Sequence, residues 1–237
     1  MAVTRILILT AVELEARRLA RALELPALPR LSFPAWGRGR VRLAPVGLRA
    51  RRLDVRWASL SNGFCPALVV SAGVCGGLDP ALARGDLVLP VSVVGPSGET
   101  LKVTPSHHRL AVERAGGSVH TGLLVTTRDV VATPEAKAAL RARTGGVAVD
   151  MESALILGAA AAAGCPSLVV RGVSDGATEA LPPEVVGLLT AEGRLKSGHA
   201  ALLAVRRPRV IPRALGLRRG AGQALSAVAR SLAGLVR

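Results

Sequence analysis

The chain has 237 residues, and half of them are hydrophobic, which is enough for one large domain around a covered sheet and excludes a small disulfide-stabilised module. Its formal net charge of +15 indicates either an anionic partner or simply an Arg-rich composition. Cys65, Cys75 and Cys165 stand among apolar residues, which predicts reduced, buried thiols in a cytoplasmic protein rather than disulfides or a metal site.

No segment of the sequence predicts a transmembrane helix. The apolar run 6–12 leads into Glu13 and Glu15 without a small-residue cleavage site, which is typical of a strand rather than a signal peptide. The longest apolar stretch, 153–168, contains two glycines and is shorter than a bilayer span. We therefore expect a cytoplasmic protein, with peripheral contact to the inner membrane surface as a further option.

Apolar runs that end in Gly, Ser or Asp and precede helical patterns predict the main strands. Because parallel strands covered on both faces are apolar throughout, this pattern predicts an α/β fold around a mostly parallel sheet. The expected strands are residues 5–10, 67–72, 85–90, 123–127, 146–151 and 167–173. The expected helices are 12–23 and a basic helix 49–60, with a β-meander at 27–47 between them.

A polar loop is expected around Ser106, His107 and His108. Two adjacent His side chains would point in opposite directions along an extended chain, and no third ligand is near them in sequence. The sequence therefore predicts a solvated loop and no metal site there.

The last part of the sequence, 197–237, contains no acidic residue and alternates Arg with aliphatic residues. Pro208, Pro212, Gly216 and Gly220 are expected to divide it into short helices. We predict an α/β domain over 1–196 and a basic, amphipathic helical extension over 197–237. The extension could bind an anionic membrane surface, pack on the domain or form a dimer contact.

Residues 69–80 read as a buried strand that runs into a Gly-rich turn. A Gly-rich turn lets a ligand approach the backbone and leaves N–H groups for ribose hydroxyls, water or phosphate, although a sharp bend alone would give the same pattern. The block lacks the Lys-Ser/Thr pair of a P-loop.

Acidic residues follow two of the predicted strands. Asp150 and Glu152 lie at a strand end, where open α/β folds bind ligands, and at least one of them should hold a sugar diol; alternatively, Glu152 simply favours a helix N-terminus. Asp175 could cap the next segment, or burial could keep it protonated so that it acts as a general acid. Arg171, in a buried strand, is expected to pair with Glu15 or Glu152.

Four ordered blocks together resemble the purine nucleoside phosphorylase and nucleosidase superfamily: residues 10–15, 72–77, 149–152 and 171–175. The resemblance covers most of the first 180 residues. It implies a three-layer α/β/α sandwich with a mixed, mostly parallel sheet, a homodimer, and no metal or organic cofactor.

The resemblance also implies roles for the reacting groups. Asp175 would protonate the five-membered ring of the departing purine, and Ser174 would orient that carboxyl. Glu15 would activate the attacking water, and Arg171 would position the Glu15 carboxylate and the water.

Other matching residues would bind the substrate. Glu152 would bind the ribose hydroxyls and Met151 would pack on the sugar. The backbone near Val130 and Val131 would line the base pocket, and further substrate contacts are expected from Gly73 and Val74.

Water is the expected nucleophile. Bacterial phosphorylases of this superfamily place an Arg where this chain has Ser71, and Glu15 is available as a base for water. Arg49, Arg51 or Arg52 could still supply the charge that phosphate needs, so phosphate stays open as a co-substrate.

The resemblance extends to a particular substrate. Residues 176–183 and 190–194 and the Arg-Arg-Pro run at 206–208 look like hopanoid-associated members, which implies release of adenine from adenosylhopane, a lipid-linked nucleoside. The alternatives are a methylthioadenosine/S-adenosylhomocysteine nucleosidase and a futalosine hydrolase. A nucleic-acid-binding module is not expected, because the chain has no Tyr, few other aromatic residues and no binding motif.

Overall fold

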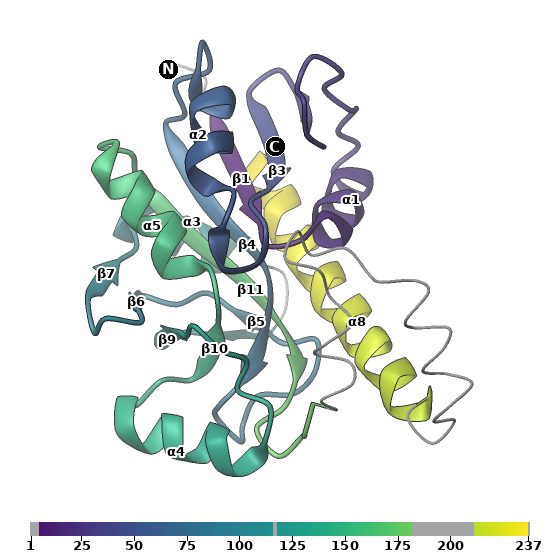
Figure 1. The fold of residues 1–237 in the computed structure, drawn as a ribbon, viewed down its shortest axis with the longest axis vertical. Coiled ribbons are helices and arrows are strands. Elements are labelled where there is room, and N and C mark those ends of the chain that lie inside the picture. Colours follow the sequence, from purple (N-terminus) through teal and green to yellow (C-terminus); the bar gives the residue numbers. More distant parts are fainter. Residues whose placement is uncertain (1–4, 116–117, 182–210, 237) are drawn as a thin grey trace.

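The computed structural model describes residues 5–115, 118–181 and 211–236 and shows a central sheet between two layers of helices (Figure 1). The eleven strands in the described residues form one sheet, in which parallel pairings outnumber antiparallel ones. The three-layer α/β/α architecture with a mixed, mostly parallel sheet is confirmed.

Helices separate single strands or short runs of strands along the chain. The strands are β1 (Ile6–Thr10), β2 (Trp36–Arg38), β3 (Val41–Pro45), β4 (Leu68–Gly77), β5 (Leu87–Val88), β6 (Ser92–Val94), β7 (Thr100–Lys102), β8 (Val119–His120), β9 (Leu123–Thr126), β10 (Ala148–Asp150) and β11 (Ser167–Asp175). The helices are α1 (Glu13–Ala22), the 3-10 turn η1 (Leu48–Ala50), α2 (Leu53–Ser61), α3 (Pro105–Glu113), α4 (Pro134–Thr144), α5 (Ser153–Ala162) and α8 (Ile211–Val236).

Side chains of β1 alternate between the two hydrophobic cores. Ile6 and Ile8 pack into the core beneath α1, α3 and α8, whereas Leu7 and Leu9 pack into the core beneath α2 and α5. All four are at most 3% exposed, because successive side chains of a strand point to opposite faces and both faces are covered here.

β4 pairs with three other strands. It pairs in parallel with β1 and β11, and at Gly76 and Gly77 it also pairs with β10. The predicted Gly-rich turn is therefore wrong for residues 73–77, which continue the strand because both β11 and β10 supply hydrogen-bonding partners there. The chain segments that follow β1, β10 and β11 consequently meet around the end of β4.

The predicted division of the C-terminal segment is wrong for its described part, where α8 is one helix of 26 residues. Pro212 lies in its first turn, where a missing N–H costs no internal bond. Gly220 packs directly against the Ser174 carbonyl, and Gly172 of β11 packs against Ala224 of α8. These glycines allow close contact between helix and strand, and that packing offsets the low helix propensity of Gly220. Pro208 lies outside the described residues.

The apolar face of α8 belongs to the largest hydrophobic core. Leu225, Val228 and Leu232 are buried there with residues of β1, β4 and β11. The described part of the extension therefore packs on the sheet. No helix within the described ranges is long and apolar enough to cross a membrane.

Two further local predictions are wrong. Ser106, His107 and His108 lie in α3 rather than in a loop, because Pro105 suits a first helical turn and Ala111 is buried nearly two turns later. The basic helix predicted for 49–60 is divided: η1 comes first and α2 begins only at Leu53.

Replacing Gly172 with Ala should destabilise the protein by about 1–3 kcal/mol, because the new methyl group would push α8 away from β11. Gly158→Ala in α5 is the matched control: nothing lies within 4 Å of its added carbon, and Ala favours a helix by about 0.5–1 kcal/mol. Urea unfolding measures both variants, and equal effects would contradict the close packing of α8 on β11.

Candidate active site

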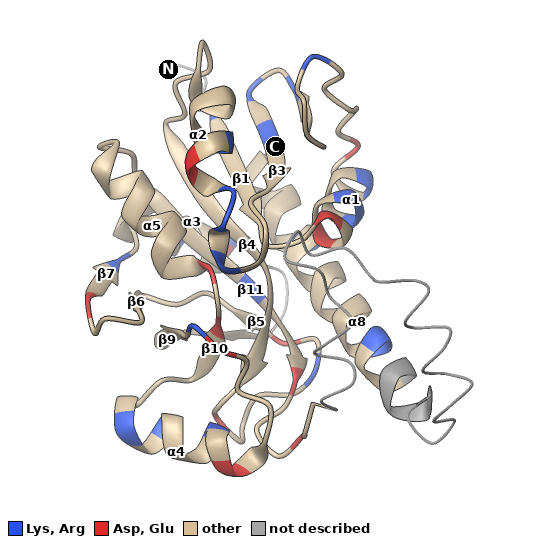
Figure 2. Ribbon diagram, in the orientation of Figure 1, with Lys and Arg blue, Asp and Glu red and all other residues tan. Residues whose placement is uncertain are grey.

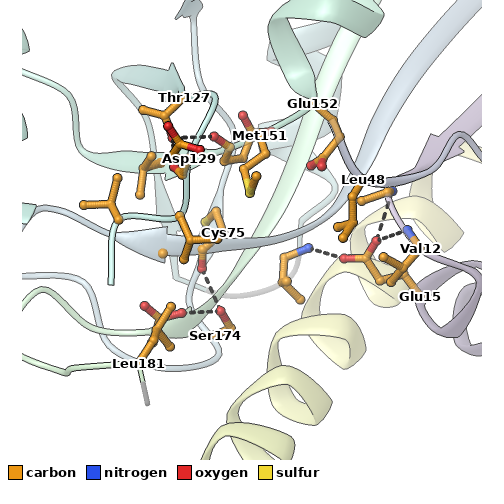
Figure 3. A pocket seen from close by; sticks show the side chains of 18 residues that line it. Val12, Glu15, Leu48, Cys75, Thr127, Asp129, Met151, Glu152, Ser174 and Leu181 are labelled. Atoms are coloured by element: carbon orange, nitrogen blue, oxygen red, sulfur yellow. Dashed lines mark hydrogen bonds between the residues drawn. The ribbon is translucent and has the colours of Figure 1, made fainter. Parts of the chain in front are cut away.

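A cavity of about 250 Å³ lies at the end of β4. Its walls come from α1, η1, β4, β10 and β11 and from the segments that follow β1, β9, β10 and β11, and Figure 3 shows side chains converging on it. The lining includes Val12, Glu15, Leu48, Val74, Cys75, Val130, Val131, Met151, Glu152, Ser174, Asp175 and Leu181. All the predicted site residues except Gly73 and Arg171 therefore line one cavity.

Glu15 is a buried carboxylate at the start of α1. Its Oε2 accepts hydrogen bonds from the backbone N–H groups of Ala11 and Val12, both at 3.1 Å, and its Oε1 accepts one from Val74 at 3.0 Å. Burial raises the pKa of Glu15, although Arg171 and these N–H groups oppose the shift. A fixed carboxylate with a raised pKa is suited to take a proton from water.

Gly73 does not line the cavity, but its lack of a side chain lets Glu15 and Arg171 lie close to each other. Its φ of 152° favours glycine, and a Cβ at this position would lie 2.7 Å from Glu15 Oε1 and 2.6 Å from Arg171 Nη1. The missing side chain therefore leaves the room in which these two groups approach each other.

Arg171 is fully buried, but its ion-pair partner differs from the prediction. Its Nη2 lies 2.7 Å from Asp150 Oδ2, because Asp150 ends β10 beside β4. Neither Glu15 nor Glu152 lies within an ion-pair distance of the guanidinium. Arg171 also donates to the hydroxyls of Ser71 and Ser153. Burial alone would lower the pKa of Arg171, but the three surrounding carboxylates raise it, so the guanidinium stays charged.

Asp150 lies in the cavity lining but is only 6% exposed, and its carboxylate is held by the buried network. Its Oδ1 accepts a hydrogen bond from Thr126 Oγ1 at 2.6 Å, and its Oδ2 accepts one from the backbone N–H of Ser153 at 3.0 Å. With the Arg171 ion pair, both carboxylate oxygens are occupied. Of the two neighbouring acids, Glu152 is thus the one available to a sugar.

Glu152 precedes α5 and is 4% exposed. Its Oε1 accepts a hydrogen bond from the backbone N–H of Arg49 at 2.9 Å, in the part of η1 where Arg49 and Ala50 take positive φ angles. This contact accounts for the interruption of the predicted helix. Burial, and then the charge of Asp150, raise the pKa of Glu152 to about 7. Met151 lies next to it in the cavity wall (Figure 3).

Glu152→Gln should raise the unfolding midpoint at pH 8 and have little effect at pH 5. A carboxyl whose pKa rises from 4.5 to about 7 on folding destabilises the protein increasingly as pH rises between these values, because the charged form is the disfavoured one. Thermal unfolding at both pH values checks this, with exposed Glu113→Gln as the control. A gain that did not depend on pH would contradict it.

Asp175 and Ser174 end β11, where the pairing with β4 shifts register. Asp175 is 3% exposed, and its Oδ1 lies 2.6 Å from Ser174 Oγ. Its Oδ2 lies 2.6 Å from Nζ of Lys137 in α4, a fully buried residue that the sequence analysis missed. In Figure 3, Ser174 and Leu181 lie at one side of the cavity and Glu15 at the other.

The remaining wall is mostly apolar. Val130 and Val131 line it together with Leu181, whose backbone N–H donates to the carbonyl of Ala132 at 2.8 Å. Cys75 also faces the cavity, but burial raises the pKa of its thiol, so it is not an activated nucleophile. Within the described ranges, no group of three His, Cys, Asp or Glu side chains could hold a metal ion.

Comparisons with solved structures show the same fold. The 5'-methylthioadenosine/S-adenosylhomocysteine nucleosidase of Neisseria meningitidis, solved with methylthio-immucillin-A, has a TM-score of 0.75 and 21% identity, over 98% of both chains. The futalosine hydrolase of Helicobacter pylori has a TM-score of 0.74 and 19% identity, over 99% of this chain and 97% of its own.

A third structure, the S-adenosylhomocysteine nucleosidase of Streptococcus pyogenes with 5-methylthiotubericidin, gives a TM-score of 0.72 and 22% identity, over 100% of this chain and 97% of its own. A search among curated proteins found no match. A family model described as the phosphorylase superfamily matches residues 5–203. Because this match spans most of the sequence, the chain belongs to the phosphorylase superfamily.

Proposed function

We propose that this protein hydrolyses the bond between adenine and ribose in an adenine nucleoside. The observation that carries the proposal is the placement of three buried carboxyl groups, those of Glu15, Glu152 and Asp175, around one cavity. They come from three strand ends far apart in sequence. Structures with the same fold belong to nucleosidases that were solved with adenosine-like ligands, which agrees with such a reaction.

In the proposed reaction, Asp175 gives its proton to the five-membered ring of adenine while the bond to ribose breaks and its electron pair leaves with the base. The sugar then carries oxocarbenium character, and Glu152 holds its hydroxyls. Water attacks the anomeric carbon on the face away from the base, and Glu15 accepts the proton that the water releases. Solvent returns that proton to Asp175 after the products leave.

We favour water over phosphate as the nucleophile because the Arg side chains near the cavity already bind other groups of the protein. Arg171 is paired with Asp150, and Ser71 is buried in a hydrogen-bonding network with Ser153 and Arg171. The guanidinium of Arg49 binds the carbonyl of Arg128 and the carboxylate of Asp129. A phosphate would have to compete with these partners.

We further propose adenosylhopane as the substrate and the inner membrane surface as the place of reaction. The apolar wall formed by Leu48, Val130 and Leu181 would tolerate a hydrocarbon substituent. Positive charge in the described residues is spread over α1, α2, α4 and α8 (Figure 2), so a membrane contact depends mainly on the basic sequence 197–237. A homodimer is part of this proposal.

A soluble methylthioadenosine or S-adenosylhomocysteine nucleosidase is the second candidate, because proteins of that name share the fold over nearly their whole length. Release of the free base should be measured from adenosylhopane in vesicles, from methylthioadenosine and from inosine, each with and without phosphate; the base is adenine for the first two and hypoxanthine for inosine. We expect phosphate-independent release that is fastest from adenosylhopane. Faster turnover of methylthioadenosine would favour the second candidate, and no release from any nucleoside would refute the proposed function.

A further inference from the structure

The buried ammonium group of Lys137 is placed beside the acid of the proposed reaction. Lys137 lies in α4, 38 residues before Asp175, and its side chain is 0% exposed. Its Nζ donates to Asp175 Oδ2 at 2.6 Å, to the Gly176 carbonyl at 2.7 Å and to the Glu179 carbonyl at 3.0 Å. All three protons of the ammonium group are therefore used, and its orientation is fixed.

Among the described residues, Asp175 is the carboxyl group that lies against this charge. The Glu179 carboxylate lies 2.6 Å from Arg84 and is neutralised there. Asp150 and Arg171 are the other charged residues near Cys75, and they form an ion pair with each other. A buried lysine without a counter-charge is costly, so this contact favours the step in which the proton leaves Asp175 and the carboxylate forms.

The two oxygens of Asp175 have different neighbours. Oδ2 faces the Lys137 ammonium, which can only donate, so the acidic proton belongs on Oδ1. Oδ1 lies 2.6 Å from Ser174 Oγ, which also lies 3.1 Å from the Cys75 carbonyl. The single hydroxyl proton of Ser174 can point to Cys75 while Asp175 is protonated and turn to Oδ1 once the proton has gone.

We propose that Lys137 is a positioning residue for proton transfer to the leaving purine, an inference that rests on the proposed function. It holds Oδ2, directs the proton to Oδ1 and stabilises the carboxylate that remains when this proton moves to the base. Lys137 keeps its own three protons throughout. Such stabilisation acts on the step in which charge develops on Asp175.

The test compares neutral and charged replacements of Lys137. Lys137→Gln and Lys137→Met remove the charge, Lys137→Arg keeps it, and Arg141→Met, one turn later in α4 and paired with Asp79, is the matched control. Adenine release should fall about tenfold to a hundredfold in kcat for the neutral variants, with KM little changed. Lys137→Arg should recover at least part of the loss, and Arg141→Met should retain full activity.

A series of adenine nucleosides with ring substituents of graded basicity separates this role from simple structural support. Weaker proton transfer should slow the more basic purines most. In an Asp175→Asn background, Lys137→Gln should add no further loss. An equal loss for every purine, an additive effect in that background, or neutral variants that fail to fold while Lys137→Arg folds would overturn the inference. Full activity of Asp175→Asn itself would instead refute the proposed acid.

Discussion

Replacing Asp175 with Asn lowers adenine release at least about a hundredfold, the scale of general acid catalysis. The Asn side chain fills the same space at the end of β11 but has no acidic proton for the purine. Because that proton moves only as the bond to ribose breaks, the loss should fall on kcat, with KM little changed. Steady-state adenine release measures both constants.

Asp54→Asn is the matched control for this variant, since Asp54 is an exposed carboxylate in α2 outside the cavity lining. Thermal unfolding should accompany the kinetics, because Asp175→Asn also removes the partner of the buried Lys137. A folded variant with wild-type kcat would remove Asp175 from the reaction.

Replacing Glu15 with Gln should lower hydrolysis about a hundredfold to ten-thousandfold, because the amide cannot accept a proton from water. The Gln oxygen can accept from Ala11 and Val12 or from Val74, but its NH2 group then faces the other N–H donor, so thermal unfolding should accompany the kinetics. Glu13→Gln, which changes a partly exposed carboxylate in the same helix, should leave turnover unchanged.

Added phosphate makes the Glu15→Gln experiment more specific. If water is the nucleophile, phosphate should not restore the rate of the variant. Recovery of adenine release with ribose 1-phosphate as the second product would show phosphorolysis, in which Glu15 is not needed as a base for water.

The sequence predicted the strands and the acids at their ends because both leave local signals. The run at β1 is apolar on both faces, and Glu15, Glu152 and Asp175 follow such runs directly. Since β1 and β11 both run parallel to β4, their carboxyl ends share one edge of the sheet, and the approach of Glu15 and Asp175 could be predicted without coordinates. Glu152 follows β10, which is antiparallel to β4, so its place beside them depends on the sheet topology.

Features that depend on contacts between distant segments were not predicted. Lys137 meets Asp175 only because α4 packs beside the end of β11, and the sole hint is that the Arg-rich chain has a lysine there. Arg171 pairs with Asp150 because Glu15 is held by backbone N–H groups and Glu152 by Arg49. Each choice of partner depends on geometry that spacing along the chain does not fix.

The glycines of α8 and β4 illustrate how packing overrides local propensity. Gly216 and Gly220 would weaken an isolated helix, yet α8 is continuous because Gly220 permits contact with β11. The run 73–77 contains three glycines but continues as a strand, since β10 and β11 pair with it. Composition alone cannot distinguish a glycine that bends the chain from one that permits close contact.

A structure of the protein with a hydrolysis-resistant adenine nucleoside analogue tests the proposed arrangement most directly. The five-membered ring should lie within hydrogen-bonding distance of Asp175, the ribose hydroxyls should contact Glu152, and a water should lie between Glu15 and the anomeric carbon. An analogue bound with its ribose away from Glu152, or in the separate cavity lined by Leu78 and Pro134, would contradict it.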